Sequence, residues 1–428
     1  MRIVRDCPAG EYQGSHFVYG LSGMGGIRLT NTRSPTRAET PQAEQRSRGA
    51  FAALSAAHFL SYASYNALTP VLALYLVAQG HDAAFVGITI AAFSVTSVIV
   101  RPLAGAIVDR ATKPRVYAAG ALVLGLASLG YLITSVAAIL ASRVVQGGAW
   151  AVLNTTAPAM AIELAPPSQR GRAIGLLNMI RSIALPVAPP VALGLLSIAG
   201  FPAVLALTAA AGVLASAFIW TVPAVPSPAM ASRPSLRALI ERTALLPAAL
   251  ESLVYMTAPL YFAFLPLRAI ELGIAEVGVV YLAGGITMVV VQPLGRLSDH
   301  WGRLPSTAIG FAAASIGLVV FSVATDLVAL TVAGVLWAAG ASFVEPATTA
   351  MAVDRAPADR RGAALATYTS AFQVGNAVGA TAWGTVIAMF GFAPAFGLGS
   401  AVAAVGLVTV GSIFVRDARM RAAREATS

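Results

Sequence analysis

Six ionisable side chains fall near the centres of apolar segments of this 428-residue chain. They are His58, Arg101, Arg143, Arg181, Glu251 and Glu345. A charge at the centre of a membrane-spanning helix is costly, so such residues commonly mark the path of an ion or a substrate. Glu251 and Glu345 are the acids of the set, and a buried carboxyl group is suited to carrying a proton. The simpler alternative for each acid is a fixed ion pair with an arginine such as Arg181.

Aromatic and amide side chains occupy the same segments. The candidates for lining a substrate cavity are Arg181, Tyr62, Tyr65, Asn66, Trp150, Asn154, Tyr255, Trp337, Gln373 and Asn376. Aromatic rings mixed with a few amides suit a weakly polar or amphipathic organic molecule. Ordinary helix packing is the alternative for part of this set. Three buried arginines against two glutamates favour an anionic or neutral substrate over a dication.

The composition shows where these side chains must lie. Hydrophobic residues make up 57% of the chain and charged residues 11%, against about a quarter charged in an average soluble domain. The mean hydropathy is +0.76. A soluble protein of this length has too little interior to bury so much apolar surface. Cys7 is the single cysteine and the four histidines are scattered, so we expect no disulfide framework, no metal site and no cofactor.

The apolar segments have the length of transmembrane helices. A bilayer core about 30 Å thick needs about 20 residues per helix. Twelve such segments occur, near 50–78, 84–108, 116–135, 137–162, 172–198, 201–222, 246–267, 277–297, 305–325, 327–353, 364–389 and 393–415. None alternates as a membrane-spanning strand does. We therefore predict an all-α integral membrane protein with twelve transmembrane helices.

Basic residues gather in one set of the loops between these segments. They are Arg110, Lys113, Arg115, Arg170, Arg172, Arg233, Arg237, Arg242, Arg303, Arg355, Arg360 and Arg361. The loops of the opposite set carry a single basic residue, Arg268. Because loops rich in Lys and Arg stay in the cytoplasm, the pattern predicts a multi-pass protein of the inner (plasma) membrane with both termini cytoplasmic. The net charge of +10 is thus a topology signal and indicates no nucleic-acid partner.

The segments outside the spans are assigned to the cytoplasm. Residues 1–49 are polar, and because they have no apolar core they are not a signal peptide. We expect disorder over Ser34–Ala50, and translation beginning at Met24 is an alternative for this tail. A linker is predicted over 223–245 and a C-terminal tail over 416–428.

The two halves of the chain repeat each other. At an offset of 191 residues Ala159–Pro166 corresponds to Ala350–Pro357 and Gly200-Phe201 to Gly391-Phe392, and at an offset of 190 Gly105–Asp109 corresponds to Gly295–Asp299. Several matches at nearly one offset indicate duplication. We predict two pseudo-symmetric six-helix bundles, 50–222 and 246–415, which is the architecture of alternating-access transporters.

The repeat separates architectural charges from specialised ones. Arg181 has no charged counterpart, because Phe372 aligns with it, and a charge present in one half alone favours contact with a substrate or an ion. Arg143 is a candidate for energy coupling, with packing against a neighbouring helix as the alternative. His58 could titrate, although a lone buried histidine is more often neutral and hydrogen-bonded. Arg101 is interpreted as mainly structural.

Two loop motifs resemble those of the major facilitator superfamily. The first of the family's motifs, Gly-x-x-x-Asp-Arg/Lys-x-Gly-Arg/Lys, occurs with Gly105, Asp109, Arg110, Lys113 and Arg115, where Thr112 replaces the second glycine. The second half holds Gly295, Asp299, Gly302 and Arg303. The family's fourth-helix motif occurs as Arg143, Gln146, Gly147 and Ala149. The likeness covers about residues 50–415 and is strongest to the twelve-helix drug/proton antiporter branch, although the fifth-helix motif is reduced to Leu185–Pro190 without its glycines.

The duplicated loops are candidates for a conformational switch. Asp109 and Asp299 could pair with nearby basic residues in one conformation and release them in the other, and a static clamp is the alternative. Glu163 and Asp354 end the fourth and tenth spans beside Arg172 and Arg361. We expect these two acids to join the same charge clusters.

The chain is therefore expected to be a secondary active transporter rather than an enzyme. The resemblance implies proton-coupled efflux of small amphipathic organic molecules or drugs, and the alternative is a proton symporter or facilitator that imports a small metabolite. A polytopic membrane enzyme would need a catalytic cluster at one membrane face, and none is present. No Gly-x-x-x-x-Gly-Lys-Ser/Thr loop occurs, so ATP is not the expected energy source. The expected partners are a small molecule, protons and the lipid bilayer, with the protein acting as a monomer.

Overall fold

The computed structural model describes residues 41–223 and 240–425. The chain divides into two units, Met1–Arg48 and Gly49–Ser428, and the helices below belong to the second except for the start of the first helix. All regular elements in the described ranges are helical. The predicted N-terminal tail and most of the predicted linker lie outside those ranges. Disorder to Ala50 is not found, because α1 begins at Pro41 in a stretch rich in good helix formers.

Helices of the first half join through short connections. They are α1 (Pro41–Ala78), α2 (Ala83–Arg110), α3 (Lys113–Leu126) with the 3₁₀ turn η1 (Ala127–Leu132), α4 (Val136–Leu164), η2 (Pro167–Gln169) and α5 (Arg170–Trp220). Side chains cap the N-termini of α2 and α4. Asp82 Oδ1 accepts a hydrogen bond from Phe85 N at 2.8 Å, and Ser135 Oγ accepts one from Ala138 N at 3.2 Å. Such caps satisfy amide groups that a helix leaves without partners at its start.

The second half repeats this pattern with more interruptions. Its elements are η4 (Arg242–Ala244), α6 (Leu245–Pro259), the π-helix η5 (Leu260–Phe264), α7 (Leu265–Glu271), α8 (Gly278–Val291), η6 (Gln292–Arg296), α9 (Leu297–Trp301), α10 (Arg303–Val323), α11 (Leu327–Asp354), η7 (Ala358–Arg360), α12 (Arg361–Phe390) and α13 (Phe392–Glu425). The predicted tail from 416 is thus helical as far as Glu425. Its arginines and alanines favour continuation of the helix.

Eight helices in the described ranges are long and apolar enough to cross a bilayer. They are Ala83–Val108, Lys113–Leu132, Val136–Leu164, Pro167–Trp220, Arg242–Glu271, Arg303–Val323, Leu327–Asp354 and Phe392–Met420. The predicted twelve are not confirmed by this measure. The spans expected at 172–198 and 201–222 lie in one helical run, and that at 277–297 is the shorter apolar helix Gly278–Leu294. The spans expected at 50–78 and 364–389 are helical, but they carry polar residues such as Asn66 and Gln373.

Two glycines at corresponding positions turn the chain between helices. Gly200 interrupts α5 with φ 74° and ψ −178°, and Gly391 ends α12 with φ 84° and ψ −179°. This backbone region is open essentially to glycine alone. The 191-residue offset found in the sequence is therefore matched by the same turn in each half.

We expect Gly200→Ala to lower the free energy of unfolding by about 1 to 3 kcal/mol, because a Cβ strains this conformation. Thermal unfolding of the purified protein in detergent measures the loss. Gly194→Ala is the matched control, since an added Cβ there meets nothing within 4 Å and alanine favours a helix by about 0.5 to 1 kcal/mol. Equal melting temperatures for the two variants would contradict this account of the turn.

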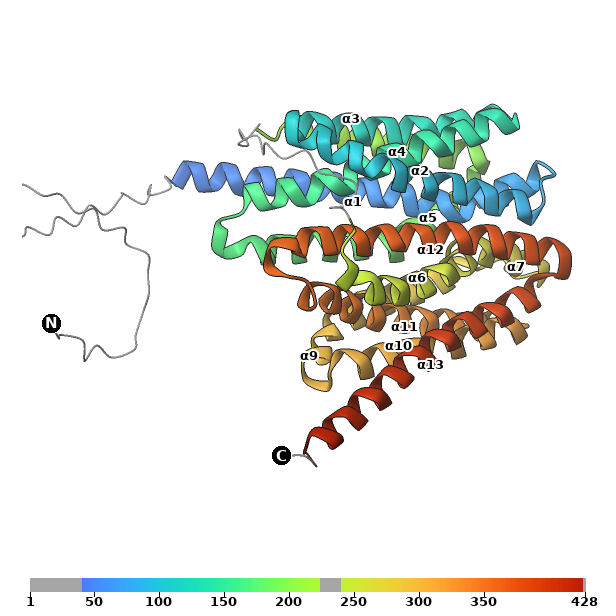
Figure 1. Ribbon diagram of the computed structural model, residues 1–428. Coiled ribbons are helices and arrows are strands. Elements are labelled where there is room, and N and C mark those ends of the chain that lie inside the picture. The colour runs from blue at the N-terminus through green and yellow to red at the C-terminus, as the bar shows by residue number, and fades with distance from the viewer. Residues whose placement is uncertain (1–40, 224–239, 426–428) are drawn as a thin grey trace, which may run out of the picture. The chain divides into compact units, whose positions relative to one another are not determined.

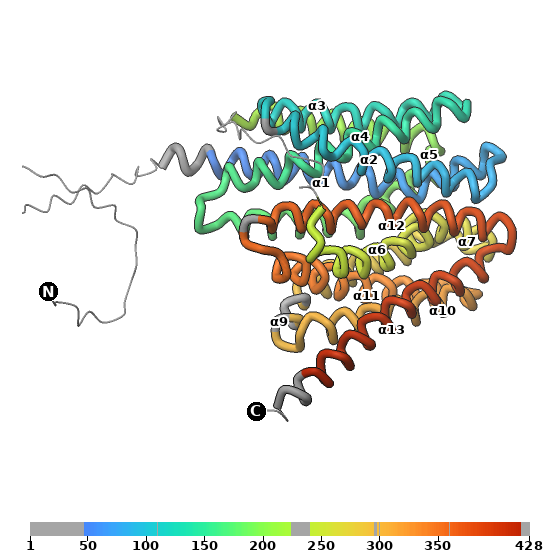
Figure 2. The backbone as a smooth tube through the Cα atoms, viewed as in Figure 1, coloured from blue at the N-terminus to red at the C-terminus, as the bar shows by residue number. Residues whose placement is uncertain are grey.

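The helices form two sets that meet along two seams. In the first half α2 packs on α4, and α3 packs on α4 and α5; in the second, α10 packs on α11 and α13, and α6 on α12. Figure 1 shows α3 and α4 on one side, α10 and α13 on the other, and α12 between. The backbone trace in Figure 2 follows α12 alongside α6. The seams between the halves are α2 with α12 and α5 with α8.

The seams depend on close backbone approach. An added Cβ at Gly87 of α2 would overlap the Ala380 carbonyl of α12, and one at Gly285 of α8 would overlap Pro186 of α5. Small residues permit such contact between membrane helices. Gly87 lies in the half of α2 next to the 79–82 turn, so this seam is closed toward that end of the helices.

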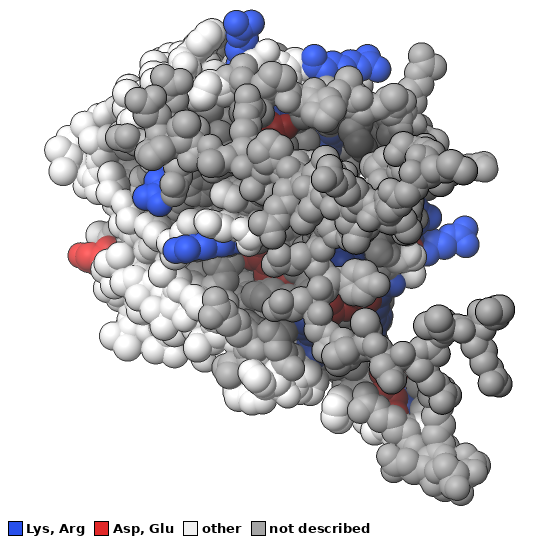
Figure 3. Space-filling view, turned by 90° about the vertical axis from the view of Figure 1, so that its left-hand side faces the viewer, with Lys and Arg blue, Asp and Glu red and all other residues white. Residues whose placement is uncertain are grey.

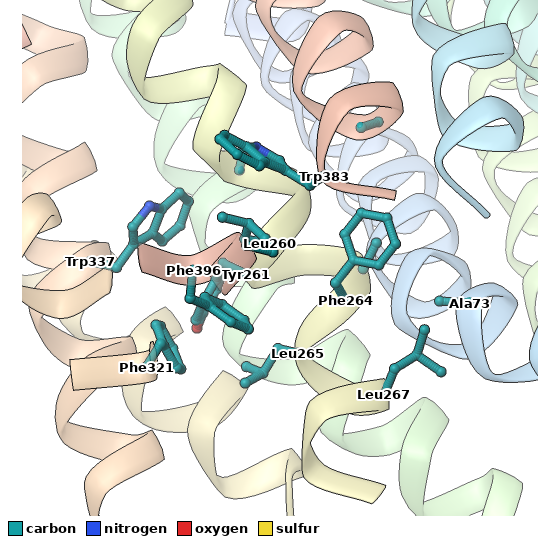
Figure 4. Packing of buried hydrophobic residues seen from close by; sticks show 14 of the residues in the cluster. Ala73, Leu260, Tyr261, Phe264, Leu265, Leu267, Phe321, Trp337, Trp383 and Phe396 are labelled. Atoms are coloured by element: carbon teal, nitrogen blue, oxygen red, sulfur yellow. The ribbon is translucent and has the colours of Figure 1, made fainter. Parts of the chain in front are cut away.

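Aromatic packing fills the interior of the second half. Figure 4 shows Tyr261, Trp337, Phe321 and Phe396 gathered in one cluster. The rings of Tyr261 and Trp337 stack with centroids 4.6 Å apart, and those of Phe321 and Phe396 lie 5.1 Å apart. Rings at such distances add packing energy beyond their buried area.

The π-helix η5 follows from one proline. Pro266 has no N–H to bond the carbonyl four residues earlier, that of Phe262. The hydroxyl of Tyr281 donates to this oxygen at 3.1 Å and is 3.0 Å from the Tyr261 oxygen. The Phe262 carbonyl oxygen thereby has a hydrogen-bond donor despite the break in the helix. Phe262 also lines a cavity between the halves.

Candidate functional site

A cavity of about 230 Å³ lies between the two halves. Its walls come from α1, α2, α4 and α5 of the first half and from α6, α8, α11 and α12 of the second. All ten side chains predicted as cavity candidates line it, namely Arg181, Tyr62, Tyr65, Asn66, Trp150, Asn154, Tyr255, Trp337, Gln373 and Asn376. Glu251 and Glu345 line it as well.

An ion pair joins the halves inside the cavity. Arg181 Nη2 of α5 donates to Glu345 Oε1 of α11 at 2.6 Å. Both side chains remain partly open, with 26% and 29% of their surfaces exposed. The ion pair with Arg181 that the sequence offered as the alternative for Glu345 is present in this conformation. Because the partners belong to different halves, any rocking of one half against the other acts on this contact.

Glu251 has a different environment. It is 1% exposed, and its Oε2 accepts a hydrogen bond from Thr348 Oγ1 at 2.7 Å. The Thr348 hydroxyl lies 3.1 Å from the hydroxyl of Tyr368. No Arg, Lys or His within the described ranges forms an ion pair with Glu251. Burying an ionised carboxylate without a cation costs far more than burying the neutral acid, so this site suits a carboxyl group that holds a proton.

Stacked aromatic rings form the wall of the first half. The Tyr62 hydroxyl donates to Asn154 Oδ1 at 2.6 Å, and Asn154 Nδ2 donates to the Trp150 carbonyl at 3.0 Å. The Trp150 ring lies 4.6 Å from that of Tyr62 and stacks on that of Tyr65 at 4.4 Å. These bonds fix the amide and the rings in place, which leaves broad apolar faces toward the cavity.

Two predicted coupling residues lie outside the cavity lining. The ring of His58 is 4.8 Å from that of Tyr62, and its Nδ1 is buried without a hydrogen-bond partner in the described part of the chain. Arg143 is 2% exposed and lies over the rings of Phe93 and Tyr131 at 5.6 and 5.9 Å. Its Nη1 reaches Gln146 Oε1 at 3.4 Å. Both residues therefore contact aromatic rings of the first half without lining the cavity themselves.

The repeat contains a further signal for cavity residues. Arg101, interpreted from the sequence as mainly structural, lines the cavity, and so does Gln292 at the position 191 residues later. The same offset pairs Asn154 with Glu345 and Ser182 with Gln373, all of which line the cavity. When a residue of one half lines the cavity, the repeat thus predicts that the corresponding residue of the other half lines it too. The lining residues that the sequence did not single out include Phe262, Tyr281, Met288, Tyr368 and Phe372.

Ion pairs join predicted switch residues in both halves of the described part of the chain. Lys113 Nζ lies 2.7 Å from Glu163 Oε1, and Arg303 Nη2 lies 3.3 Å from Asp354 Oδ2. Each acid thus joins a basic residue of the loop motif in its own half, as expected for a member of the same charge cluster, and the two pairs use positions that correspond in the repeat. The first basic residue of the next helix is close to the acid because α3 and α10 begin immediately after the motif.

The remaining motif residues are placed as follows. Gly105 lies in α2 and Gly295 in η6, and Arg110 and Arg115 are exposed. Gly302 has φ 93° and precedes α10. The side chains of Asp109 and Asp299 lie outside the described residues. Figure 3 looks onto the end of the molecule where these loops lie and shows Lys and Arg side chains around the visible part of that face.

The family of the chain follows from sequence comparison. The family model described as Major Facilitator Superfamily matches residues 54–322 and again 248–427. The chain belongs to the major facilitator superfamily. The two matches together cover residues 54–427 and overlap over 248–322. A cavity between two sets of helices is where proteins of this architecture hold their substrates.

Two curated proteins resemble parts of the chain. An uncharacterised MFS-type transporter of Methanocaldococcus jannaschii is 30% identical over 135 residues, which are 31% of this chain and 35% of that protein. Multidrug resistance protein 2 of Bacillus subtilis is 27% identical over 150 residues, 35% of this chain and 37% of that protein. The matches span only about a third of each relative's length.

Solved structures of transporters share the fold over most of the chain. A mutant of the nucleoside transporter NupG superposes with a TM-score of 0.74 at 13% identity, covering 85% of this chain and 100% of that one. The human organic anion transporter MFSD10 gives 0.60 at 17%, covering 85% and 99%. A bacterial homologue of the human lysosomal transporter Spinster gives 0.70 at 14%, covering 87% and 97%. At these identities the likeness concerns the fold alone.

Proposed function

We propose that this major facilitator protein is a secondary active transporter that exports small amphipathic organic molecules in exchange for protons. The observation that carries the proposal is the cavity shared by the two halves, with Glu251 and Glu345 in its lining. Its aromatic and amide walls suit an amphipathic molecule. The partial likeness to multidrug resistance protein 2 of Bacillus subtilis favours export.

The proposed architecture is two six-helix bundles with twelve spans. In this scheme the long run Pro167–Trp220 is two spans separated at Gly200, and α1, α12 and the helix from Gly278 to Leu294 complete the set. The basic loops then face the cytoplasm of the cell, with both termini on that side of the inner membrane. The protein acts as a monomer, because each chain holds a whole cavity of its own.

The two acids have different proposed roles. Glu251, buried and without a cationic partner among the described residues, carries the exchanged proton, and Thr348 holds its carboxyl group in position. Glu345 is the counterion of Arg181 and links the halves. Arg143 and His58 lie behind the cavity wall and support coupling by holding Phe93 and Tyr62. The pairs Lys113–Glu163 and Arg303–Asp354 steady the loop ends of one conformation.

Proton movement in everted membrane vesicles tests the proposal. Vesicles that contain the protein are energised until a pH dye reports an acid lumen, and cationic, neutral and anionic amphiphiles are then added in turn. We expect at least one compound to release protons from the lumen, and not in vesicles that lack the protein. If none of the compounds causes proton release, although the protein is present in the membrane, export by exchange is contradicted. Import by symport or facilitated diffusion would then be favoured.

A further inference from the structure

We infer that the cavity binds organic anions, and that the anionic group of the substrate takes the place of the Glu345 carboxylate on Arg181. The inference rests on the transport function proposed above and names the substrate class of the same cavity. Glu345 then acts as a stand-in for the substrate between transport events. Four observations support it, and they concern the two partners, a second arginine, the repeat and the aromatic walls.

The contact with Glu345 engages one nitrogen of the Arg181 guanidinium group, which also interacts with the Tyr62 hydroxyl. A guanidinium group has five N–H donors in a planar fork and binds carboxylates best through two parallel hydrogen bonds. Glu345 uses one oxygen, Oε1, against one nitrogen, Nη2. About a quarter of the Arg181 side chain, 26%, is exposed to the cavity. A free carboxylate or sulfonate can engage both arms of the fork, which the single contact from Glu345 does not.

The two partners of the ion pair are not equivalent. Arginine stays charged at every physiological pH, so Arg181, with 26% of its side chain exposed, favours an anion beside it in each state of the protein. Glu345 is about equally exposed at 29%, but its carboxyl group, unlike the guanidinium group, can take up a proton and lose its charge. The replaceable member is therefore the glutamate, and its replacement must itself be negative.

A second arginine adds to the positive potential. Arg101 of α2 lines the same cavity, and no carboxylate within the described ranges forms an ion pair with it. An organic cation entering the cavity would meet the charge of Arg101 beside the Arg181–Glu345 pair, and repulsion of this kind rejects wrong partners. An organic anion is attracted by Arg101 and can compete with Glu345 for Arg181.

The repeat shows that this ion pair is specialised rather than architectural. The counterpart of Arg181 in the other half is Phe372, and the counterpart of Glu345 is Asn154. All four residues line the cavity. The fold therefore does not need charges at these positions. The ion pair Arg181–Glu345 occurs once, and the two positions related to it by the repeat hold uncharged residues.

Aromatic rings beside the ion pair indicate the rest of the ligand. Tyr255 and Phe372 have ring centroids 3.7 Å apart, and Tyr62 and Trp150 face the cavity from the first half. Flat apolar molecules pack against the open faces of such rings. The ligand that fits this lining is an aromatic monoanion, with its charge at Arg181 and its ring among these side chains.

Binding to the purified full-length protein in detergent tests the inference without any proton gradient. The probes are 1-naphthoate, its cationic analogue 1-naphthylmethylammonium and the neutral 1-naphthalenemethanol, each titrated by calorimetry. We expect naphthoate to bind most tightly. Arg181→Gln should weaken naphthoate binding about tenfold or more, the loss expected for a charged hydrogen bond, and Glu345→Gln should strengthen it because the competitor is gone.

Two further variants make the result specific. Arg181→Lys keeps the charge and loses the planar fork, so its affinity for naphthoate should lie between those of wild type and Arg181→Gln. Arg416→Gln removes an exposed arginine in the last part of α13 and should leave binding unchanged. Size-exclusion chromatography shows which variants are folded, and the gain of affinity in Glu345→Gln does not depend on a loss of function.

The inference is overturned if the ammonium probe binds more tightly than naphthoate, or if Arg181→Gln changes naphthoate affinity by less than about twofold. Absence of naphthoate binding to Glu345→Gln would also overturn it. Failure of the transport proposal is seen separately, in the vesicle assay. Proton release that only cations trigger would support exchange and contradict the anion site. Naphthoate binding that depends on Arg181, without proton release, would support the anion site and contradict exchange.

Discussion

We expect Glu251→Gln to abolish proton-driven transport while leaving substrate exchange intact. Glutamine has nearly the shape of a protonated glutamate and can accept the hydrogen bond from Thr348 Oγ1 that now reaches Glu251 Oε2 at 2.7 Å. The cavity wall is therefore kept, and the ability to take up and release a proton is lost. The rate of proton-driven transport should fall about a hundredfold or more, as when a positioned proton-transfer group is removed.

The measurement compares two modes in proteoliposomes. Uphill transport driven by a pH gradient requires the proton, and counterflow of labelled against unlabelled substrate does not. Glu276→Gln is the matched control, because Glu276 is an exposed acid that lies just before α8. A Glu251→Gln protein with unchanged uphill transport would show that Glu251 is not the proton carrier, and loss of both modes would show a structural role.

We expect a disulfide between Ser94→Cys and Asn376→Cys to stop transport. In the structure Asn376 Nδ2 of α12 donates to Ser94 Oγ of α2 at 2.8 Å, across one of the two seams between the halves. The two helices pack against each other along this seam, and two cysteines form a disulfide where their Cα atoms lie within about 7 Å. The bond would hold the seam closed and trap this conformation, so the transport rate should fall to less than about a tenth of the reduced value.

The chain makes the crosslinking experiment simple. Cys7 is the single native cysteine and is replaced in the background by Cys7→Ser. Oxidation should inhibit the double variant only, and reductant should restore its rate. The control variants, Ser94→Cys alone and Asn376→Cys alone, should be unaffected by either treatment. Transport that continues in the fully crosslinked protein would mean that the α2–α12 seam does not open during the cycle.

Much of the site could be predicted from residue type and position. Polar residues in apolar helices are costly, and this cost is why the sequence alone assigns Arg181, Glu345 and Asn376 to the interior of the helix bundles. The turns at Gly200 and Gly391 could likewise be anticipated from the repeat. These features are local in the sequence, and the physical rule acts on one helix at a time.

Partners across the molecule could not be predicted in the same way. The choice of Glu345 rather than Glu251 as the partner of Arg181 depends on how α5 and α11 face each other across the two halves. The break of the α6–α7 run at η5 depends on the hydroxyl of Tyr281, on another helix, which supplies the bond that Pro266 removes. Both are contacts over long separations in the chain, and the period of one helix contains no information on them.

Two further details also depend on contacts or side chains that the sequence does not rank. The sequence places Glu163 and Asp354 in the charge clusters of the loop motifs, and the particular partners, Lys113 and Arg303, become visible only in the structure. Twelve spans were predicted from length, whereas the polar lining of α1 and α12 lowers the apolar content of the very helices that build the cavity. Hydropathy therefore underestimates helices whose function requires polar side chains.

The central claim is that the two halves alternate around the cavity. Electron paramagnetic resonance distances in lipid nanodiscs test it most directly, with spin labels at Gln79→Cys and Met389→Cys for one end and at Ser168→Cys and Ala358→Cys for the other, each pair on the Cys7→Ser background. All four sites are exposed. When the pH is lowered from about 8 to about 5, we expect the first distance to increase and the second to decrease in part of the population. Distances that stay constant at both ends, or that change together in the same direction, would contradict alternating access.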